Sequence, residues 1–120
     1  MWTWIIRTGE LQQNGTSIDH GYSGAPDDKN NPADVSVKDH GPIPSGKYTI
    51  CAPRDTTTHG PYVLPLQPDP SNEMYGRGSF LIHGDKIGAP GTASEGCIIL
   101  SRPTREKIWQ SNDPELTVTA

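Results

Sequence analysis

A histidine and a cysteine that flank a glycine-rich loop are the residues best able to carry chemistry in this chain. His83 ends the apolar run 79–83, and Cys97 begins the apolar run 97–100. A thiol attacks a carbonyl only as the thiolate, which a free cysteine with a pKa of about 8.5 rarely forms at neutral pH. A neighbouring imidazole can take the thiol proton and later return it to the leaving group. If the two runs form neighbouring strands, both side chains can meet at one end of a sheet, which predicts cysteine-based acyl transfer.

Residues around this pair are candidates for supporting roles. Gly96 lets the backbone pack tightly beside the thiol, so that peptide N–H groups could face a developing oxyanion. Ser94 could hydrogen-bond this loop or a substrate, or it could be a turn residue. Glu95 would oppose thiolate formation if it lay near Cys97, so we expect it to point to solvent. Arg77 could bind a carboxylate in a bidentate fork, or it could be an ordinary solvated arginine.

The remaining histidines and the second cysteine leave alternatives open. His59 lies in a polar loop and could reach the site, although exposure to solvent is the more common position for such a residue. Cys51 is expected to be buried and inert, and a Cys51–Cys97 disulfide is the direct competitor of the catalytic interpretation. A lone cysteine at the start of a buried strand is usually a small hydrophobic residue. No Cys-x-x-Cys or His-Glu-x-x-His motif is present, so we expect no metal site and no cofactor.

Length and composition bound the class of protein. The chain has 120 residues, of which 32% are hydrophobic, and it carries a net charge of −4. This size predicts a single domain over residues 1–120, and we expect a monomer. Because no basic cluster is present, nucleic acid is not an expected partner. No run of about 18 apolar residues exists, so membrane insertion is not expected, and the first residues do not resemble a secretory signal peptide.

Turn-forming residues predict short strands. With 13 glycines and 12 prolines in 120 residues, the composition favours a mainly β domain, a sandwich or a sheet, over a helical bundle. Apolar runs and alternation predict strands at 2–7, 11–13, 16–23, 47–52, 79–83, 97–100 and 116–119. Residues 53–62 are predicted to form a polar loop. Residues 61–70 place apolar side chains between prolines, so any strand there should be short or at a sheet edge.

One short helix and an aromatic core complete the expected fold. Ser101 can cap a helix that has Pro103 in its first turn. We expect Trp109 to anchor this helix to the sheet. Trp2 and Trp4 alternate across a threonine and are expected to lie in the core.

Several motifs, in the expected order, resemble the L,D-transpeptidase (YkuD-type) domain. His83-Gly84 followed by Ser94-Glu95-Gly96-Cys97-Ile98 is similar to the signature of that family, which is a histidine-glycine at a strand end, a loop, and then Ser/Thr-His-Gly-Cys. The resemblance is greatest to the L,D-transpeptidase-like effectors delivered by type VI secretion. It covers roughly residues 2–110 and is also carried by the stretches 8–11, 21–24, 41–48 and 76–80. At Glu95 the chain departs from the wider family, which has a histidine there.

The resemblance implies an L,D-transpeptidase-like catalytic domain that acts on peptidoglycan. Cys97 would attack the carbonyl of the third residue of a tetrapeptide stem, expel the terminal D-alanine and leave a thioester. Water would complete an L,D-carboxypeptidase cycle, and a free D-amino acid would complete an exchange. The resemblance also implies that the backbone carbonyl of Gly84 orients His83 as the third member of a triad, with Asp85 as a less favoured alternative.

The resemblance further suggests a cleft, partners and a site of action. Tyr22 and Ser23 could line the cleft, or they could simply pack at a strand end. As an antibacterial effector, the protein would be made in the cytoplasm without a signal peptide and would act in the periplasm of a target bacterium. Its partners would be tetrapeptide stems and an immunity protein. Two other interpretations stay open: a non-catalytic module that binds stem peptides, favoured by Glu95, and an adaptor in which Cys51 and Cys97 are bridged.

Overall fold

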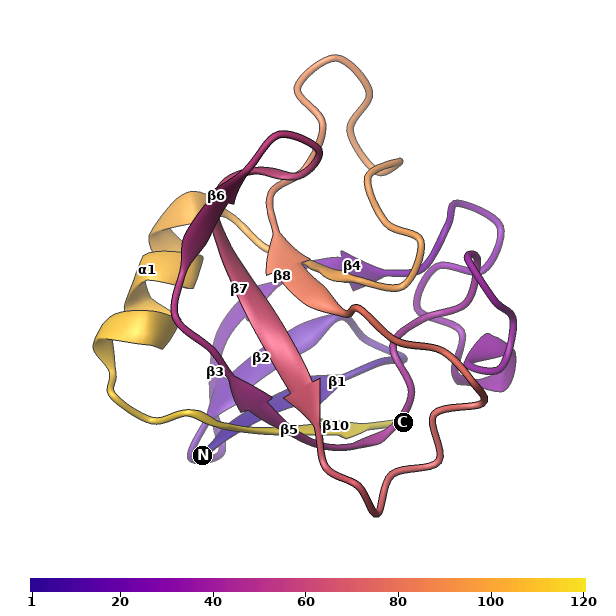
Figure 1. The fold of residues 1–120 in the computed structure, drawn as a ribbon, viewed down its shortest axis with the longest axis horizontal. Coiled ribbons are helices and arrows are strands. Elements are labelled where there is room, and N and C mark those ends of the chain that lie inside the picture. The colour runs from indigo at the N-terminus through magenta and orange to yellow at the C-terminus, as the bar shows by residue number, and fades with distance from the viewer.

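The computed structural model describes all residues from Met1 to Ala120 and consists mainly of β-strands (Figure 1). The elements are β1 (Trp2–Ile5), β2 (Glu10–Gln13), β3 (Thr16–His20), β4 (Tyr22–Ser23), the 3-10 helix η1 (Pro32–Asp34), β5 (Gly46–Ile50), β6 (Arg54–Thr56), β7 (Gly60–Pro68), β8 (Leu81–His83), β9 (Ile98–Ile99), α1 (Arg102–Gln110) and β10 (Glu115–Thr119). The predicted fold class, mainly β with one short α-helix, is confirmed. None of the helices has the length and the apolar character needed to cross a membrane.

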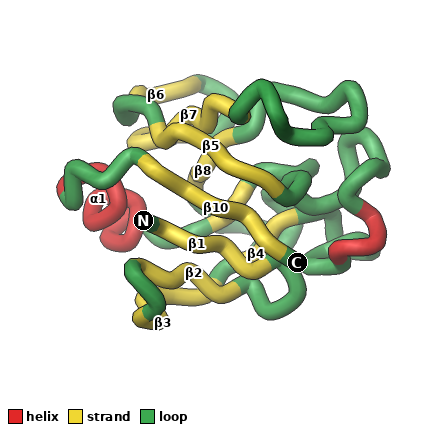
Figure 2. The backbone as a smooth tube through the Cα atoms, turned by 90° about the horizontal axis from the view of Figure 1, so that it is seen from below, coloured by secondary structure: helices red, strands yellow, loops and turns green.

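The strands form a sheet that curls back towards its own beginning. Its order is β3-β2-β1-β10-β5-β7-β8-β9-β4, and β6 pairs with β7 (Figure 2). The first and last strands of this order, β3 and β4, are joined in the chain by Gly21 alone. A Cβ atom at Gly21 would lie 1.9 Å from the carbonyl oxygen of Ile99, so only glycine fits there. The prediction of one continuous strand at 16–23 is therefore wrong, because the chain leaves one end of the sheet for the other at Gly21.

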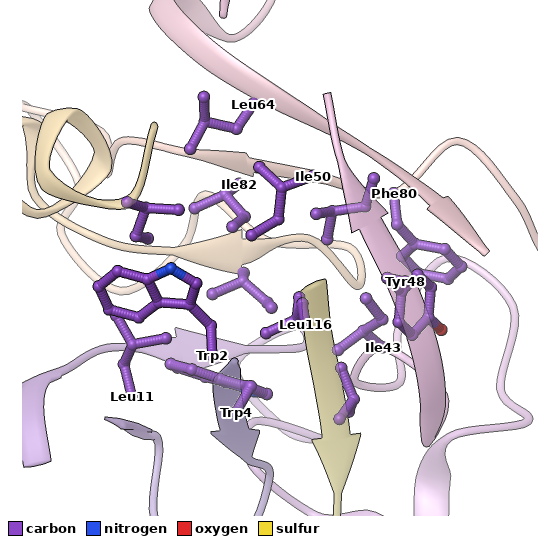
Figure 3. Packing of buried hydrophobic residues seen from close by; sticks show 14 of the residues in the cluster. Trp2, Trp4, Leu11, Ile43, Tyr48, Ile50, Leu64, Phe80, Ile82 and Leu116 are labelled. Atoms are coloured by element: carbon purple, nitrogen blue, oxygen red, sulfur yellow. The ribbon is translucent and has the colours of Figure 1, made fainter. Parts of the chain in front are cut away.

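The hydrophobic core lies between the two halves of the curled sheet. Alternation along β1 turns Trp2 and Trp4 inward, and both are fully buried, as predicted. In Figure 3 they lie beside Leu11 and face Ile50 and Ile82 on the other side of the core. Burying side chains of this size stabilises the fold by about 1.5–3 kcal/mol each. This cluster therefore holds together the two halves of the sheet, one of which carries the site.

Helix α1 packs against β7 and β8. Ser101 is its N-cap residue, as predicted, and the Ser101 hydroxyl donates to Thr104 Oγ1 (3.1 Å). The side chain that faces the sheet is Ile108, which is 1% exposed, whereas Trp109 is 36% exposed. The expectation that Trp109 anchors the helix is therefore wrong. Successive helical residues point about 100° apart, so only one of this pair can face the sheet.

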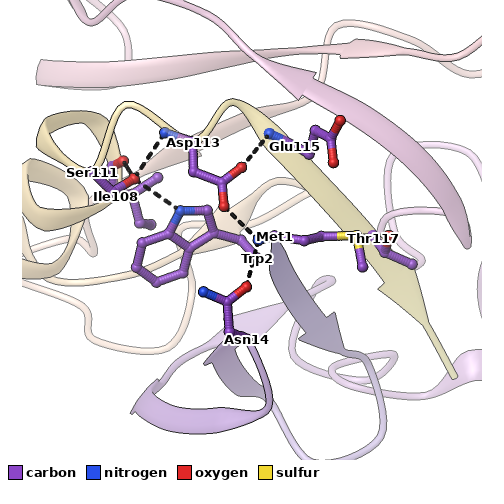
Figure 4. A network of polar contacts seen from close by, with 8 residues as sticks. All are labelled: Met1, Trp2, Asn14, Ile108, Ser111, Asp113, Glu115 and Thr117. Atoms are coloured by element: carbon purple, nitrogen blue, oxygen red, sulfur yellow. Dashed lines mark hydrogen bonds and ion pairs between the residues drawn. The ribbon is translucent and has the colours of Figure 1, made fainter.

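A polar network joins the end of α1 to the first and last strands (Figure 4). Trp2 Nε1–H donates to Ser111 Oγ (3.2 Å), and the Ser111 hydroxyl donates to the carbonyl of Ile108 (2.6 Å). The backbone N–H of Asp113 donates to the same Ser111 oxygen (3.2 Å), and the Asp113 carboxylate pairs with the amino group of Met1. These contacts hold the turn after α1 against β1, which places β10 for its parallel pairing with β1.

Strand β7 is longer and more central than the sequence predicts. It spans nine residues and lies between β5 and β8, although residues 53–62 were expected to form a loop and 61–70 a short or edge strand. The strand changes partners along its length: residues 60–63 pair with β6, 64–65 with β8 and 66–68 with β5. In an antiparallel ladder, only alternate residues donate to a given neighbour. Prolines, which have no N–H, are therefore tolerated within β7.

Candidate active site

Strands β8 and β9 place the histidine and the cysteine on one face of the sheet. They are parallel neighbours, with Ile82 opposite Ile98 and His83 opposite Ile99. Because side chains alternate, Ile82 and Ile98 enter the core while His83 and Cys97 point to the other face. The prediction of neighbouring strands is confirmed, but because the strands are parallel, the end of β8 and the start of β9 lie at opposite ends of the pair. In this parallel register His83 and Cys97 lie two positions apart, about 8 Å between Cα atoms at usual strand dimensions.

His83 and Cys97 line the same pocket, which has a volume of about 830 Å³. One wall is the β6–β7 turn at residues 58–61, and a second is the segment 76–80 that leads into β8. A third wall comes from the two ends of the segment between β8 and β9, chiefly residues 83–87 and 92–97, and the rest from Lys38, Asp39 and Arg105. The middle of this segment forms the loop that protrudes at the top of Figure 1, beside the β6–β7 turn.

The imidazole of His83 is held in one orientation. Its Nδ1 lies 2.9 Å from the carbonyl oxygen of Gly84. Because a carbonyl only accepts, Nδ1 carries the proton and Nε2 is left as the basic nitrogen. The carboxylate of Asp85 does not orient His83; it accepts from Tyr22 Oη (2.6 Å) and from the backbone N–H of Lys86 (2.9 Å). The orienting contact that the resemblance implies is thus present in the structure.

Burial keeps the His83 imidazole neutral. The residue is 3% exposed, and burial lowers its pKa below the ordinary value of 6.5. The contact with the Gly84 carbonyl raises this pKa, whereas the neighbouring His59 and Arg105 lower it. At neutral pH the imidazole is therefore uncharged and able to accept a proton.

The Cys97 thiol is also neutral at rest. Burial raises its pKa to about 11, and the charge of Glu95 acts in the same direction. The backbone of Leu81 and the charge of Arg77 oppose this shift. No hydrogen bond joins the thiol to His83, and Cys51 and Cys97 are both free thiols, so the disulfide of the adaptor interpretation is not formed. Cysteine and histidine thus form a neutral pair rather than a preformed ion pair.

Ser94 fixes the loop that precedes the cysteine. Its hydroxyl donates to the carbonyl of Cys97 (2.6 Å) and accepts from the backbone N–H groups of Gly24 (2.9 Å) and Gly96 (3.0 Å). Both roles left open for Ser94 are present: it bonds the loop that carries Cys97, and its bond from the N–H two residues later is that of a turn residue. Because the Gly96 N–H is already bonded to Ser94, an oxyanion donor in this loop would have to be another peptide N–H group.

Arg77 has a structural role, and its guanidinium is not free to bind a substrate. Its Nη1 donates to the carbonyls of Val35 (2.5 Å) and Pro42 (2.8 Å), and its Nη2 donates to those of Gly41 (2.9 Å) and Glu95 (3.2 Å). The residue is only 9% exposed. The fork that was expected to bind a substrate carboxylate is therefore occupied by backbone carbonyls. Arg77 joins residues 35–42 to the cysteine loop and leaves a positive charge beside the thiol.

Tyr22 and Ser23 also support the site from outside the pocket. Neither is among the residues that line it, contrary to the expectation that they line the cleft. Tyr22 Oη donates to Asp85 Oδ1 (2.6 Å) and accepts from the backbone N–H of Ala93 (3.0 Å), so it ties together the two ends of the protruding loop. The buried Ser23 hydroxyl donates to the carbonyl of Gly96 (2.8 Å). Both side chains position the segments that carry His83 and Cys97.

Two further residues line the pocket: one was given little weight from the sequence, and the other was missed. His59, at the β6–β7 turn, is exposed, as expected, yet its ring centroid lies 4.6 Å from that of His83. Arg105 on α1 is buried behind Gly84 and donates to the carbonyls of Tyr62 (3.0 Å) and Leu100. For His59, the only indication in the sequence that it could reach the site was its position in a polar loop. Nothing in the sequence pattern pointed to Arg105, because its position depends on how α1 packs.

Substitution of Gly96 tests how tightly the cysteine loop is built. Gly96 has a φ of +138°, and a Cβ there would lie 2.6 Å from Arg77 Nη2 and 2.8 Å from the Phe80 ring. We expect Gly96→Ala to lower the free energy of unfolding by about 1–3 kcal/mol, measured by urea denaturation. The control is Gly88→Ala, because a Cβ at Gly88 meets nothing within 4 Å. Equal stability of the two variants would contradict this account of the loop.

A known protein family matches the part of the chain that contains this site. The family model described as the Tlde1 domain matches residues 18–118 of the chain. The matched range contains every residue that lines the pocket, from Lys38 to Arg105. The search of curated proteins found no match.

Proposed function

This chain belongs to the Tlde1 domain family, which is a family of type VI secretion effectors directed at peptidoglycan, and from that premise we propose that it is a cysteine acyltransferase acting on peptide stems. The observation that carries the proposal is the placement of His83 and Cys97 in one pocket, with Nδ1 of His83 held by the Gly84 carbonyl. This arrangement supplies a nucleophile and an oriented base, which are the two groups that acyl transfer through a thioester requires.

In the first half of the reaction, the sulfur of Cys97 attacks the carbonyl before the terminal D-alanine of a tetrapeptide stem. His83 Nε2 takes the thiol proton as the new C–S bond forms. The same proton then passes from His83 to the leaving nitrogen as the C–N bond breaks. The products are a thioester on Cys97 and free D-alanine. In the second half, water yields a shortened stem, and a D-amino acid yields an exchanged stem.

The proposed substrate carries carboxylates, and the pocket has cations that could bind them. Lys38 and Lys86 line the pocket and are exposed. They replace Arg77 in this proposed role, because the guanidinium of Arg77 is already bonded to four carbonyls. Asp39, on the same wall as Lys38, could bind the amino group of a diamino acid in the stem.

A second candidate function is a module that binds stem peptides without cleaving them. The observation that favours it is the neutral thiol: its pKa is raised to about 11, and no hydrogen bond joins it to His83. Such a module would show saturable binding of muropeptides and no product. The enzyme interpretation is stronger because the contact with Gly84 leaves Nε2 of His83 as the basic nitrogen in the pocket that holds Cys97, and because hydrogen bonds between catalytic groups often tighten only with substrate.

Incubation of the protein with tetrapeptide muropeptides tests the proposal. Products are read by liquid chromatography and mass spectrometry, with and without an added D-amino acid. Loss of one alanine without the additive indicates hydrolysis, and a mass change only with the additive indicates exchange. The control is Cys51→Ser protein alkylated with iodoacetamide, in which Cys97 is the only thiol left to modify. No product from the unmodified protein would favour the binding module.

The type VI effector assignment suggests where the protein acts. The tetrapeptide stems of the assembled cell wall are found in the periplasm of a target bacterium and not in the cytoplasm that makes the effector. We therefore place the activity in that periplasm, with an immunity protein of the producing cell as the expected partner.

The pH dependence of the rate distinguishes a neutral catalytic pair, in which His83 takes the proton during attack, from a thiol that must first ionise on its own. His83 must be unprotonated to act as a base, and burial lowers its pKa, so kcat/KM should fall only below pH 6.5. Because the thiol pKa is about 11, the rate should stay level between pH 7 and 9 instead of rising through about 8.5. The measurement is kcat/KM for D-alanine release across this range. A tenfold rise between pH 7 and 9 would contradict the neutral pair.

A further inference from the structure

Each half of the proposed reaction exchanges one proton with solvent. At neutral pH, the released D-alanine leaves as an ammonium ion, so thioester formation takes up one proton. The second half releases one proton, whether the acceptor is water, which leaves a carboxylate, or the ammonium group of a D-amino acid. Because the Cys97 sulfur regains one proton at the same time, two protons leave the acceptor. One returns to sulfur through His83, and the other must reach solvent, which a second base in the pocket would make faster.

His83 is a poor site for this second proton. It is almost fully buried, and burial, His59 and Arg105 all lower its pKa. Among the charged groups near it, only Asp85 favours a protonated ring, and the Asp85 carboxylate is bonded to Tyr22 and to backbone N–H groups. An additional proton near His83 therefore needs an acceptor that is in contact with water.

His59 is the one other imidazole in the pocket. Its ring lies 4.6 Å from that of His83, between centroids, with the planes tilted by 49°. The β6–β7 turn holds it in place, because its backbone N–H donates to Thr56 Oγ1 (2.9 Å) and its Nδ1 lies 3.0 Å from Thr58 Oγ1. Nε2 has no hydrogen-bond partner, and the side chain is exposed. His59 thus combines contact with the pocket and access to solvent.

We propose that His59 is the general base for the acceptor in the second half of the reaction, an inference that rests on the proposed function. His59 Nε2 removes one proton from the incoming water or ammonium group, and the freed electron pair forms a bond to the thioester carbonyl. The C–S bond then breaks, and the sulfur takes the second acceptor proton through His83. His59 releases its proton to solvent, which completes the balance.

The test compares His59→Gln with His20→Gln, the latter at an exposed histidine that does not line the pocket. Released D-alanine is counted per protein molecule, and intact-protein mass spectrometry detects the thioester. With His59→Gln we expect a burst of one D-alanine, accumulation of the acylated protein and turnover about 100-fold slower than wild type. Hydroxylamine, whose amine is unprotonated at neutral pH, should restore loss of the acyl group. His20→Gln should behave as wild type.

The outcomes separate the two proposals. If His59→Gln turns over at the wild-type rate, or loses the burst together with turnover, His59 is not the acceptor base. If hydroxylamine does not discharge the acylated variant faster than water, the defect is structural and the inference also fails. If the wild-type protein itself forms neither D-alanine nor a thioester, the proposed function fails, and the role of His59 fails with it.

Discussion

Cys97→Ala should release no measurable D-alanine from tetrapeptide stems, a loss of about 10⁴-fold or more relative to wild type. The variant lacks the only atom in the pocket that can form the thioester, so the two easier steps of covalent catalysis are not available to it. His83 remains, but a base without a nucleophile can only activate water against an unactivated amide. Initial rates of D-alanine release measure the effect.

The fold should survive this substitution. Cys97 points to the pocket face of the β8–β9 pair, while the core is formed by Ile82 and Ile98 on the opposite face. The urea midpoint of Cys97→Ala should therefore match that of Cys51→Ala, and Cys51→Ala should keep wild-type activity because Cys51 does not line the pocket. Activity above a hundredth of the wild-type rate in Cys97→Ala would rule out Cys97 as the nucleophile.

Arg77→Met should destabilise the protein by about 3 kcal/mol or more and abolish activity with it. The guanidinium serves four carbonyls, and the bonds to Gly41 and Pro42 are buried. Each buried acceptor that loses its partner costs about 1–3 kcal/mol. The methionine side chain fills much of the same space but donates no hydrogen bond. The measurement is the free energy of unfolding from urea denaturation, with D-alanine release measured in parallel.

Arg77→Lys provides the graded comparison. The lysine ammonium group can donate to some of the four carbonyls, but it cannot reach both residues 35–42 and the cysteine loop as the planar guanidinium does. Arg77→Lys should therefore lose less stability than Arg77→Met. If Arg77→Met instead keeps its stability within about 1 kcal/mol and only raises KM, Arg77 binds the substrate carboxylate, as the sequence suggested. The free energy of unfolding and KM thus distinguish a structural role of Arg77 from binding of the substrate carboxylate.

The fold class and the core could be predicted because they depend on local patterns. The alternation of Trp2 and Trp4 with polar neighbours marks one buried face of a strand, and both residues are in the core. Proline and glycine content predicts short strands, and Pro103 after a capping serine predicts the start of α1. Candidates for the chemistry could be named in the same way, since only a few residue types can act as nucleophile or base.

Most of the errors involve contacts between distant segments. The nine-residue β7 looked like a broken strand, because its prolines are acceptable only where the strand changes partners. Arg77 looked like an open fork because the four carbonyls that occupy it come from residues far from it in the chain. Tyr22 and Ser23 were assigned to the cleft, whereas their hydroxyls bond to segments about 70 residues away.

By itself, the sequence determined a small mainly β domain and its tryptophan core, and it singled out His83 and Cys97 as the candidates for acyl transfer. Only the tertiary structure decided that their strands are parallel, that both side chains share one pocket, and that His59 joins them there. The physical reason is that side-chain type and alternation are local properties of a chain. Strand direction, the partners of a buried guanidinium and the loops around a pocket are set by packing between segments far apart in sequence.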